Sequence, residues 1–238
     1  EPILAPSQPD VRDFERKTLY RANIIKDRTE TLGHPFVMFY NGKQEGKHGI
    51  ERIGMAVSED MIHWTRFGRE PVIDNLTGIS GDPQIVRMND LWVMFYFGHR
   101  WKPKAFDTFA CSRDLVNWTK WDGPHLIEPS EDPEAFDSTF AHKPWMIKHD
   151  GVGYHFYCSV KKSDRTIALA NDRLREAVDL VLDPWIDHQP LRLYGAADLA
   201  ADPQATAHAA AAMVAALPAG VACRCSPLRC RWCWPGTR

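Results

Sequence analysis

Three polar residues recur at a constant spacing and could together carry chemistry. Arg21, Asp82 and Lys143 lie 61 positions apart (82 − 21 = 61 and 143 − 82 = 61), and each stands at the start of a short apolar segment. If the repeated segments lie side by side, one carboxylate is placed between two cations. Nearby cations lower the pKa of a carboxylate, often by about 1–3 units, so we expect Asp82 to be ionised at neutral pH. An ionised carboxylate suits a general base or an electrostatic stabiliser and does not suit a general acid.

Groups that could donate a proton in the same site precede Lys143. Asp137 is the first candidate, because it comes before the third repeated segment in a Phe-Asp-Ser context, and His142 and Glu134 are the others. Carboxylic acids and imidazole both act as general acids when their pKa suits the working pH. Structural interpretations compete: Asp82 in an Asp-Pro turn, Asp137 as a turn or cap residue, and His142 as a hydrogen-bonded core histidine.

The segments that would position these residues form an internal repeat. The run Val37-Met38-Phe39-Tyr40 recurs 56 positions later as Val93-Met94-Phe95-Tyr96 and, 61 positions after that, as Tyr154-His155-Phe156-Tyr157. Another apolar run precedes each of them, separated from it by turn residues such as Asn89-Asp90. Short aromatic and β-branched runs bounded by turns are typical of strands, so each repeat begins with two strands.

A third strand and a polar turn complete each of the first two repeats. Residues 58–64 and 112–118 share the pattern Ser-x-Asp-x-x-x-Trp at a spacing of 54. Asp60 and Asp114 can accept backbone N–H bonds in such turns and are expected to be structural. Residues 65–67 and 119–121 would add a fourth strand. Four strands per repeat predict an all-β fold, a β-propeller with inner strands near 20–26, 82–88 and 143–148, with a β-sandwich as the alternative.

Composition bounds the classes of partner. The formal net charge is −2, with 44% hydrophobic and 25% charged residues, so the chain can build a core and has no global field that favours nucleic acid or membrane. No apolar run reaches the roughly 18 residues of a membrane span. No Gly-x-Ser-x-Gly, phosphate-loop or dinucleotide motif occurs, and we expect no cofactor. The chain starts at Glu1 without a recognisable leader, which leaves its localisation open.

The repeat pattern breaks down after about residue 175. The third polar turn lacks its Trp, and the residues that follow are rich in Ala, Arg and Pro. We therefore expect a partial propeller over 1–175 and an atypical tail over 176–238 that is irregular or helical, disordered or translated out of frame. Four cysteines crowd its end: Cys223, Cys225, Cys230 and Cys233. They could hold zinc, but they lack paired Cys-x2-Cys spacing, so no metal site is expected. Cys111 and Cys158 are expected to be free core thiols.

Three segments also resemble elements of one known superfamily. They are residues 53–64 (Ile-Gly-Met-Ala-Val-Ser-Glu-Asp-Met-Ile-His-Trp), 81–86 (Gly-Asp-Pro-Gln-Ile-Val) and 143–148 (Lys-Pro-Trp-Met-Ile-Lys). They are similar to blade elements of the five-bladed β-propeller glycosidases of glycoside hydrolase families 43, 32, 117 and 130. Families 43 and 32 place an Asp at the start of blade one, where this chain has Tyr20-Arg21-Ala22-Asn23, which is closer to family 130 and its mannoside phosphorylases. With three legible blades, the resemblance implies a chain cut short before the propeller closes.

This resemblance implies a glycoside hydrolase that acts on an oligo- or polysaccharide, with Asp82 as the axial base or stabiliser and Asp137, His142 or Glu134 as the acid. A family 130-like phosphorylase, with Arg21 and Lys143 holding phosphate, and a non-catalytic propeller that binds glycan or protein are the alternatives. An excess of cations favours a ligand with a uronate, sulfate or phosphate group. The expected substrate-binding residues at the axial pocket are Arg21, Asn23, His99, Arg100, Trp101, Lys143 and Trp145.

Overall fold

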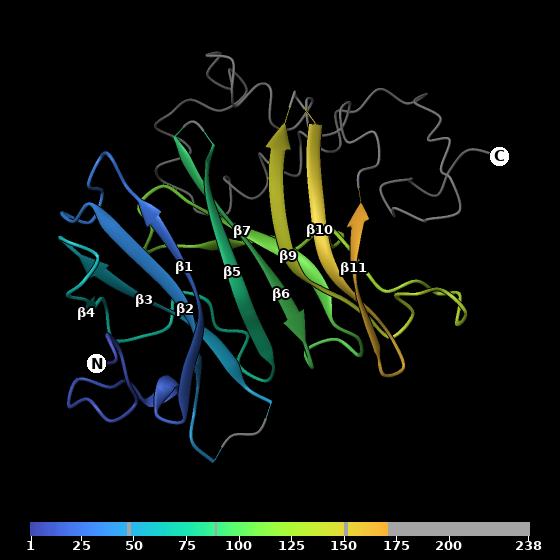
Figure 1. Cartoon of the computed structure of the whole chain (residues 1–238), viewed down its shortest axis with the longest axis horizontal. Coiled ribbons are helices and arrows are strands. Elements are labelled where there is room, and N and C mark those ends of the chain that lie inside the picture. The colour runs from blue at the N-terminus through green and yellow to red at the C-terminus, as the bar shows by residue number, and fades with distance from the viewer. Residues whose placement is uncertain (47–48, 89, 150–151, 171–238) are drawn as a thin grey trace.

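The computed structural model describes residues 1–46, 49–88, 90–149 and 152–170. These residues form eleven strands and one short 3-10 helix, η1 (Asp13–Glu15), and no α-helix occurs among them. The strands form an eight-stranded sheet, made of two antiparallel halves joined by one parallel bridge, and a separate three-stranded antiparallel sheet, and these follow one another in an open arc (Figure 1). The predicted all-β propeller architecture is therefore confirmed.

Each half of the larger sheet, and the smaller sheet, corresponds to one predicted repeat and is called a blade. Blade 1 contains β1 (Thr18–Lys26), β2 (Phe36–Lys43), β3 (Glu51–Ser58) and β4 (Thr65–Arg66). Blade 2 contains β5 (Ile79–Met88), β6 (Leu91–His99), β7 (Phe106–Ser112) and β8 (Thr119–Lys120). Blade 3 contains β9 (Phe140–His149), β10 (Val152–Lys161) and β11 (Asp164–Ala170).

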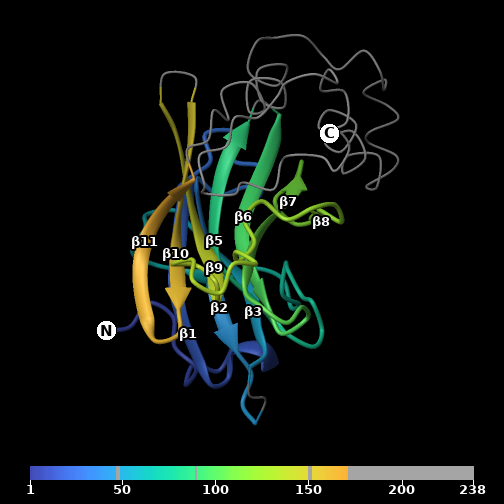
Figure 2. The same ribbon diagram turned by 90° about the vertical axis from the view of Figure 1, so that its right-hand side faces the viewer.

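The inner strands β1, β5 and β9 contain the predicted segments 20–26, 82–88 and 143–148 and lie in neighbouring blades (Figure 2). A single parallel bridge, between Glu51 and Ile79, joins blades 1 and 2, whereas β9, β10 and β11 form a separate sheet. The three inner strands therefore belong to successive blades and not to one continuous sheet.

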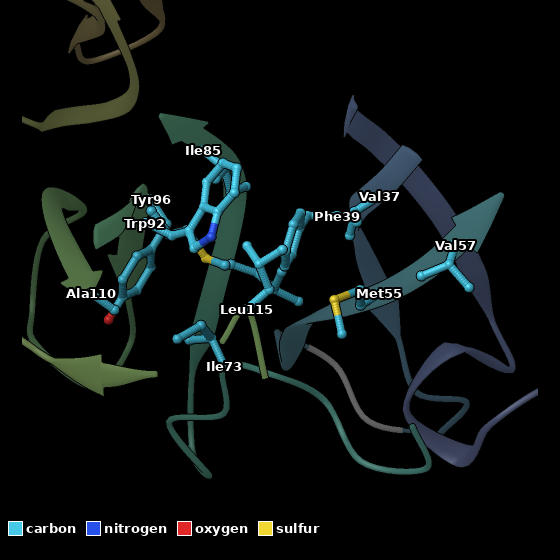
Figure 3. Close-up of a cluster of buried hydrophobic side chains, with 12 residues drawn as sticks. Val37, Phe39, Met55, Val57, Ile73, Ile85, Trp92, Tyr96, Ala110 and Leu115 are labelled. Carbon is cyan, nitrogen blue, oxygen red and sulfur yellow. The ribbon is translucent and has the colours of Figure 1, made fainter. Parts of the chain in front are cut away.

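A hydrophobic core fills the space between blades 1 and 2. Every second side chain of a strand points to the same face of its sheet. On the facing sides of the two blades, Phe39 and Met55 of blade 1 pack in one cluster with Ile85 and Trp92 of blade 2 (Figure 3). Leu115, from the second polar turn, is buried in the same cluster. The turn after β7 is thus part of the core that fixes the two blades relative to each other.

The two polar turns have the structural role expected for them. Oδ1 of Asp60 accepts the N–H groups of residues 62 and 63 at 2.8 Å, and Oδ1 of Asp114 accepts those of residues 116 and 117 at 2.9 and 2.7 Å. Inside each turn one residue adopts a left-handed conformation: Met61 with φ 66° and Leu115 with φ 65°. The repeated turn therefore places a non-glycine residue where glycine is favoured.

These two positions should respond in opposite ways to glycine. Met61 is 50% exposed and Leu115 is fully buried, at 0%. We expect Met61→Gly to raise the free energy of unfolding by up to about 1 kcal/mol, because the left-handed conformation costs other residues about 1–2 kcal/mol and glycine's entropy offsets only part of that. Leu115→Gly should lower it by roughly 2–5 kcal/mol through the cavity it leaves. Urea unfolding of both variants checks this, and a change in the same direction at both sites would contradict it.

The outer faces of the arc differ at its two ends. Residues of the N-terminal segment cover the free face of blade 1, where the ring of Phe14 packs so closely on Gly42 that an added Cβ would lie 2.9 Å from it. The face of blade 3 that points away from blade 2 carries large exposed apolar side chains in the described part of the chain. They are Trp145, Ile147, Ile167 and Leu169.

The expected boundary at residue 175, the tail and the four-cysteine cluster lie outside the described residues. Cys111 is buried and Cys158 half-buried, and both are free thiols, as expected. In the part of the chain that the structure describes, no helix has the length and apolar character needed to span a membrane.

Candidate functional site

Each inner strand is interrupted at the residue that the spacing of 61 singled out. Pairing shifts register in β1 between Tyr20 and Asn23, in β5 between Gly81 and Gln84, and opposite β9 between Phe156 and Cys158. Arg21, Asp82 and Lys143, at these bulges, have φ values of 57°, 52° and 68°. A bulge re-aims a side chain, and left-handed non-glycine residues persist only where the surroundings hold them. The three bulges turn three side chains toward one point.

At that point the structure brings Arg21, Asp82 and Lys143 together. Oδ2 of Asp82 accepts hydrogen bonds from Nε and Nη2 of Arg21 at 3.1 and 3.0 Å and from Nζ of Lys143 at 2.7 Å. We call these three residues the ion cluster. The ammonium group of Lys143 also lies 4.8 Å from the ring centroid of Phe97, a cation–π contact that stabilises the cation in this position.

Asn41 completes the surroundings of Asp82 and was missed by sequence reasoning. Its Nδ2 donates to Oδ1 of Asp82 at 2.8 Å, and its Oδ1 accepts the backbone N–H of Asp82 at 2.8 Å. Asn41 is fully buried and follows the aromatic run of β2, where the second repeat has Phe97. A buried amide at a position where the second repeat has Phe97 and the third has Cys158 was the one available signal.

The electrostatics of the ion cluster favour an ionised Asp82. Burial alone would raise the pKa of this carboxyl, but the charges and hydrogen bonds of Lys143 and Arg21 outweigh burial and lower it below its ordinary value. Two cations on one carboxylate leave a local charge of +1. The side chain of Arg21 is 57% exposed, so this positive charge is accessible to a ligand.

The three expected acids do not bond to Asp82 in the described structure. Asp137 is buried and accepts the hydroxyl of Tyr157 at 3.0 Å. His142 is buried with Nδ1 3.1 Å from the carbonyl oxygen of Cys158, and burial together with Lys143 lowers its pKa to about 4. Glu134 is exposed and pairs with Lys161 at 2.9 Å. The catalytic roles of Asp137, His142 and Glu134 stay predictions.

The residues expected to bind substrate fall into different environments. Asn23 accepts the N–H of Ile85 through Oδ1 at 3.0 Å and so links blades 1 and 2. Trp101 donates from Nε1 to the carbonyl oxygen of Ile79 at 2.8 Å and packs against the main core. Trp145, two positions after Lys143, is half exposed.

Two further candidates lie at the end of β6. His99 packs edge-on against Phe140 at 4.9 Å, and burial together with the charge of Arg100 lowers its pKa. The guanidinium of Arg100 lies against Gly49. Of all the expected binding residues, only Arg21 and Lys143 contact Asp82, and the binding roles of the others stay predictions. No group of His, Cys, Asp or Glu side chains that could hold a metal ion occurs among the residues described.

Comparison with known proteins supports the resemblance seen in the sequence. Two solved structures, one named "Glycoside hydrolase" and the other an RGII complex, are 44% and 45% identical to this protein. Each has a TM-score of 0.65, and the match covers 71% of this protein and 50% of the solved one. The chain is therefore similar to these two structures in both sequence and fold. No family model matches it.

More distant matches extend the comparison. An α-L-arabinofuranosidase from Lactobacillus brevis is 12% identical, and the match covers 69% of this chain and 54% of that enzyme. Its TM-score of 0.54 shows that the two share the fold. A "1,2-beta-oligomannan phosphorylase" of Thermoanaerobacter sp. (strain X514) is 27% identical over 203 residues, 80% of this chain and 58% of that protein. The "Beta-1,2-mannobiose phosphorylase" of the same organism is 30% identical over 153 residues, covering 56% and 46%. The chain thus spans about half the length of its relatives, which are carbohydrate-active enzymes.

Proposed function

We propose that the protein is a glycoside hydrolase that acts on an oligo- or polysaccharide at the ion cluster, with Asp82 as its axial carboxylate. The observation that carries the proposal is the convergence of three bulged inner strands on one buried, ionised Asp82. The relative at 44% identity, named "Glycoside hydrolase", supports the hydrolytic assignment.

The hydrogen bonds of Asp82 favour an electrostatic role over that of a base. Four N–H groups from Arg21, Lys143 and Asn41 point at Asp82, three of them at Oδ2 and one at Oδ1. The charges and hydrogen bonds of Lys143 and Arg21 lower the pKa of Asp82, and a carboxylate with a lowered pKa is a weak base. Held in this way, Asp82 keeps its charge and position and supplies a fixed negative group near the sugar, as oxocarbenium-like transition states require.

A second group must protonate the leaving oxygen. Asp137 is the preferred acid, because it is a buried carboxyl group that precedes the inner strand of blade 3. His142 suits that role less well, since an imidazole with a pKa near 4 is not in its acidic imidazolium form at neutral pH.

A phosphorylase is the second candidate, and the exposed charge of Arg21 favours it. A cluster with a net charge of +1 attracts an anion, and planar guanidinium pairs well with phosphate or carboxylate. In a hydrolase that anion would belong to the sugar, as a uronate or sulfate. In a phosphorylase it would be inorganic phosphate, the co-substrate implied by the names of the two Thermoanaerobacter relatives.

Product analysis with matched neutral and acidic oligosaccharides separates these functions. A hydrolase releases free sugar at a rate that does not depend on phosphate, whereas a phosphorylase forms a sugar phosphate only when phosphate is present. For the hydrolase we expect acidic substrates to bind more tightly than neutral ones, and salt to weaken only the acidic ones. Arg21→Ala should remove roughly 10-fold of that preference, the value of one charged hydrogen bond.

Arg16→Ala is a matched control, because Arg16 is 51% exposed and pairs with Asp13 away from the ion cluster. It should leave the preference unchanged. Equal affinity for neutral and acidic sugars without phosphate dependence would remove the anionic ligand from the proposal. Binding of carbohydrate without turnover would favour the non-catalytic alternative. The assays apply to this chain and to any longer form of the protein that contains it.

A further inference from the structure

A buried carboxylate–imidazole pair lies between blades 2 and 3, close enough to the ion cluster for the charge of Asp82 to act on it. Oδ2 of Asp107, on β7, is 2.9 Å from Nε2 of His155, on β10. Asp107 is fully buried, at 0% exposure, and His155 is nearly so. Neither side chain can touch a sugar in the described structure, so a direct catalytic role is excluded for both.

The repeat shows that the fold does not need this pair. Asp107 corresponds to Ile53 of blade 1, 54 positions earlier, and the two backbones make the same bonds: Asp107 pairs with Ile127 as Ile53 pairs with Ile73. His155 likewise corresponds to Met94, 61 positions earlier. Ile53 and Met94 are both buried in the core between blades 1 and 2. One blade interface therefore packs an apolar pair where the next has Asp107 and His155.

Packing alone does not account for the polar pair. Burial raises the pKa of Asp107 to about 6 despite His155, and its Oδ1 accepts no well-formed hydrogen bond from the described residues. Replacing a buried ion pair by apolar residues of similar volume is often neutral or stabilising. A costly pair at an internal interface points to a function of the neighbouring site.

The neighbour of Asp107 is the bulge that carries Lys143. The backbone N–H of Lys143 lies close enough to the Asp107 carboxylate to favour its ionised form, and Asp82 opposes that ionisation. The same relation exists one blade earlier, where Asn41 accepts the backbone N–H of the Asp82 bulge. Each of these two bulges is thus faced by an acceptor side chain from the preceding blade.

The titratable groups around Asp107 come from three strands. They are His155 on β10, Lys143 on β9 and Asp82 on β5. A further histidine, His125, lies on the segment after β8 and stacks on Phe106. Ile127 of the same segment pairs with the backbone of Asp107.

We propose that Asp107, held by His155, is a positioning residue that fixes the Lys143 bulge and thereby keeps the Lys143 cation on Asp82. The catalytic part of this inference rests on the function proposed above, whereas its structural part does not. Ionised Asp107 attracts the nearby backbone N–H of Lys143, although the two make no well-formed hydrogen bond, and protonated Asp107 attracts it less. Activity should therefore rise as the pH increases through about 6.

The chain itself supplies the matched replacement: Asp107→Ile with His155→Met installs the pair found between blades 1 and 2. We expect this double variant to fold and to lose the rise in activity near pH 6, with kcat lowered about 10–100-fold, as for other supporting residues. It should also gain stability relative to the wild type between about pH 4 and 7. The reason is that a carboxyl whose pKa is raised by folding loses stability as the pH rises through that range.

A readout without substrate keeps this inference separate from the proposed function. In aspartate-labelled protein, the carboxyl 13C signal of Asp82 should show a step near pH 6 as Asp107 ionises, and Asp107→Asn should remove the step. Asp82→Asn and Asp107→Asn assign the two signals. If no form of the protein turns over a sugar, this step alone supports the inference and its absence overturns it.

Unchanged kcat and pH profile in a folded double variant, with an unchanged Asp82 signal, would overturn the positioning role. If the double variant does not fold, Asp107→Asn decides the question, because it keeps the shape of the side chain and removes its charge. Wild-type kcat and an unaltered profile in Asp107→Asn would likewise sink the proposal.

Discussion

Asp82→Asn is expected to abolish turnover while the protein stays folded, with kcat lowered by at least about 10²-fold. The substitution keeps the volume of the side chain and removes its charge and one acceptor oxygen. Lys143 and Arg21 then lose their common partner, and the net charge of the cluster rises from +1 to +2. Both cations are partly exposed, so water can solvate them and the fold should tolerate the change. Steady-state kinetics with circular dichroism and thermal unfolding measure both effects.

Asp114→Asn is the control for this experiment. Asp114 also accepts backbone N–H groups, but it does so in a polar turn remote from the ion cluster. Its replacement should lower the free energy of unfolding by about 1 kcal/mol and leave kcat unchanged. Near wild-type turnover by Asp82→Asn on the true substrate would mean that Asp82 is only a residue of an Asp-Pro turn.

Glu15→Ala is expected to lower the free energy of unfolding by about 3–5 kcal/mol, the cost of breaking a buried ion pair by removing one partner. Glu15, in η1, is fully buried and pairs with Arg12 at 3.2 Å and with Arg66 of β4. The hydroxyl of Tyr40 donates to it at 2.8 Å. Removing the carboxylate leaves the buried guanidinium of Arg12 without its acidic partner and takes one of two acidic partners from Arg66, which keeps Asp10 at 2.8 Å. Denaturant unfolding gives the size of the loss.

Asp13→Ala is the matched control from the same short helix. Asp13 is 82% exposed and pairs with Arg16, so its loss should cost no more than about 1 kcal/mol. Equal effects at residues 13 and 15 would contradict the importance of burial.

The same cluster predicts an acid dependence. Burial alone would raise the pKa of Glu15, but Arg12 and Tyr40 outweigh it and lower the pKa below 4.5. A group with a lowered pKa stabilises the fold above its unfolded pKa and loses this contribution as the pH falls. Stability of the wild type should therefore fall more steeply below about pH 4.5 than that of Glu15→Ala.

The architecture could be predicted from the sequence because propeller blades are local structures. Each blade is built from strands that follow one another, so its pattern of aromatic runs and turns is written within about 60 residues. Repeats with equal spacing also place equivalent residues at equivalent points. For that reason the spacing of 61 was sufficient to indicate that Arg21, Asp82 and Lys143 meet, and Asp60 and Asp114 were correctly interpreted as turn residues.

The immediate surroundings of those residues depend on contacts between blades, which the sequence pattern does not encode. Asn41 reaches Asp82, and Asp107 reaches His155, only because packed faces of successive sheets bring their side chains together. The departure of Asp107 from the Ile53 pattern is visible in the sequence, but its partner is not.

Exposure also had to come from the tertiary structure. Trp101 stands next to Arg100 in the chain, yet its ring packs against the core, whereas Trp145 is exposed. The sequence by itself determined the blades and the three residues of the ion cluster, since both follow from local periodicity. Only the tertiary structure decided which side chains are buried, which cations face solvent and which carboxylate is held ionised. Those properties arise from long-range packing and from the low-dielectric environment that packing creates.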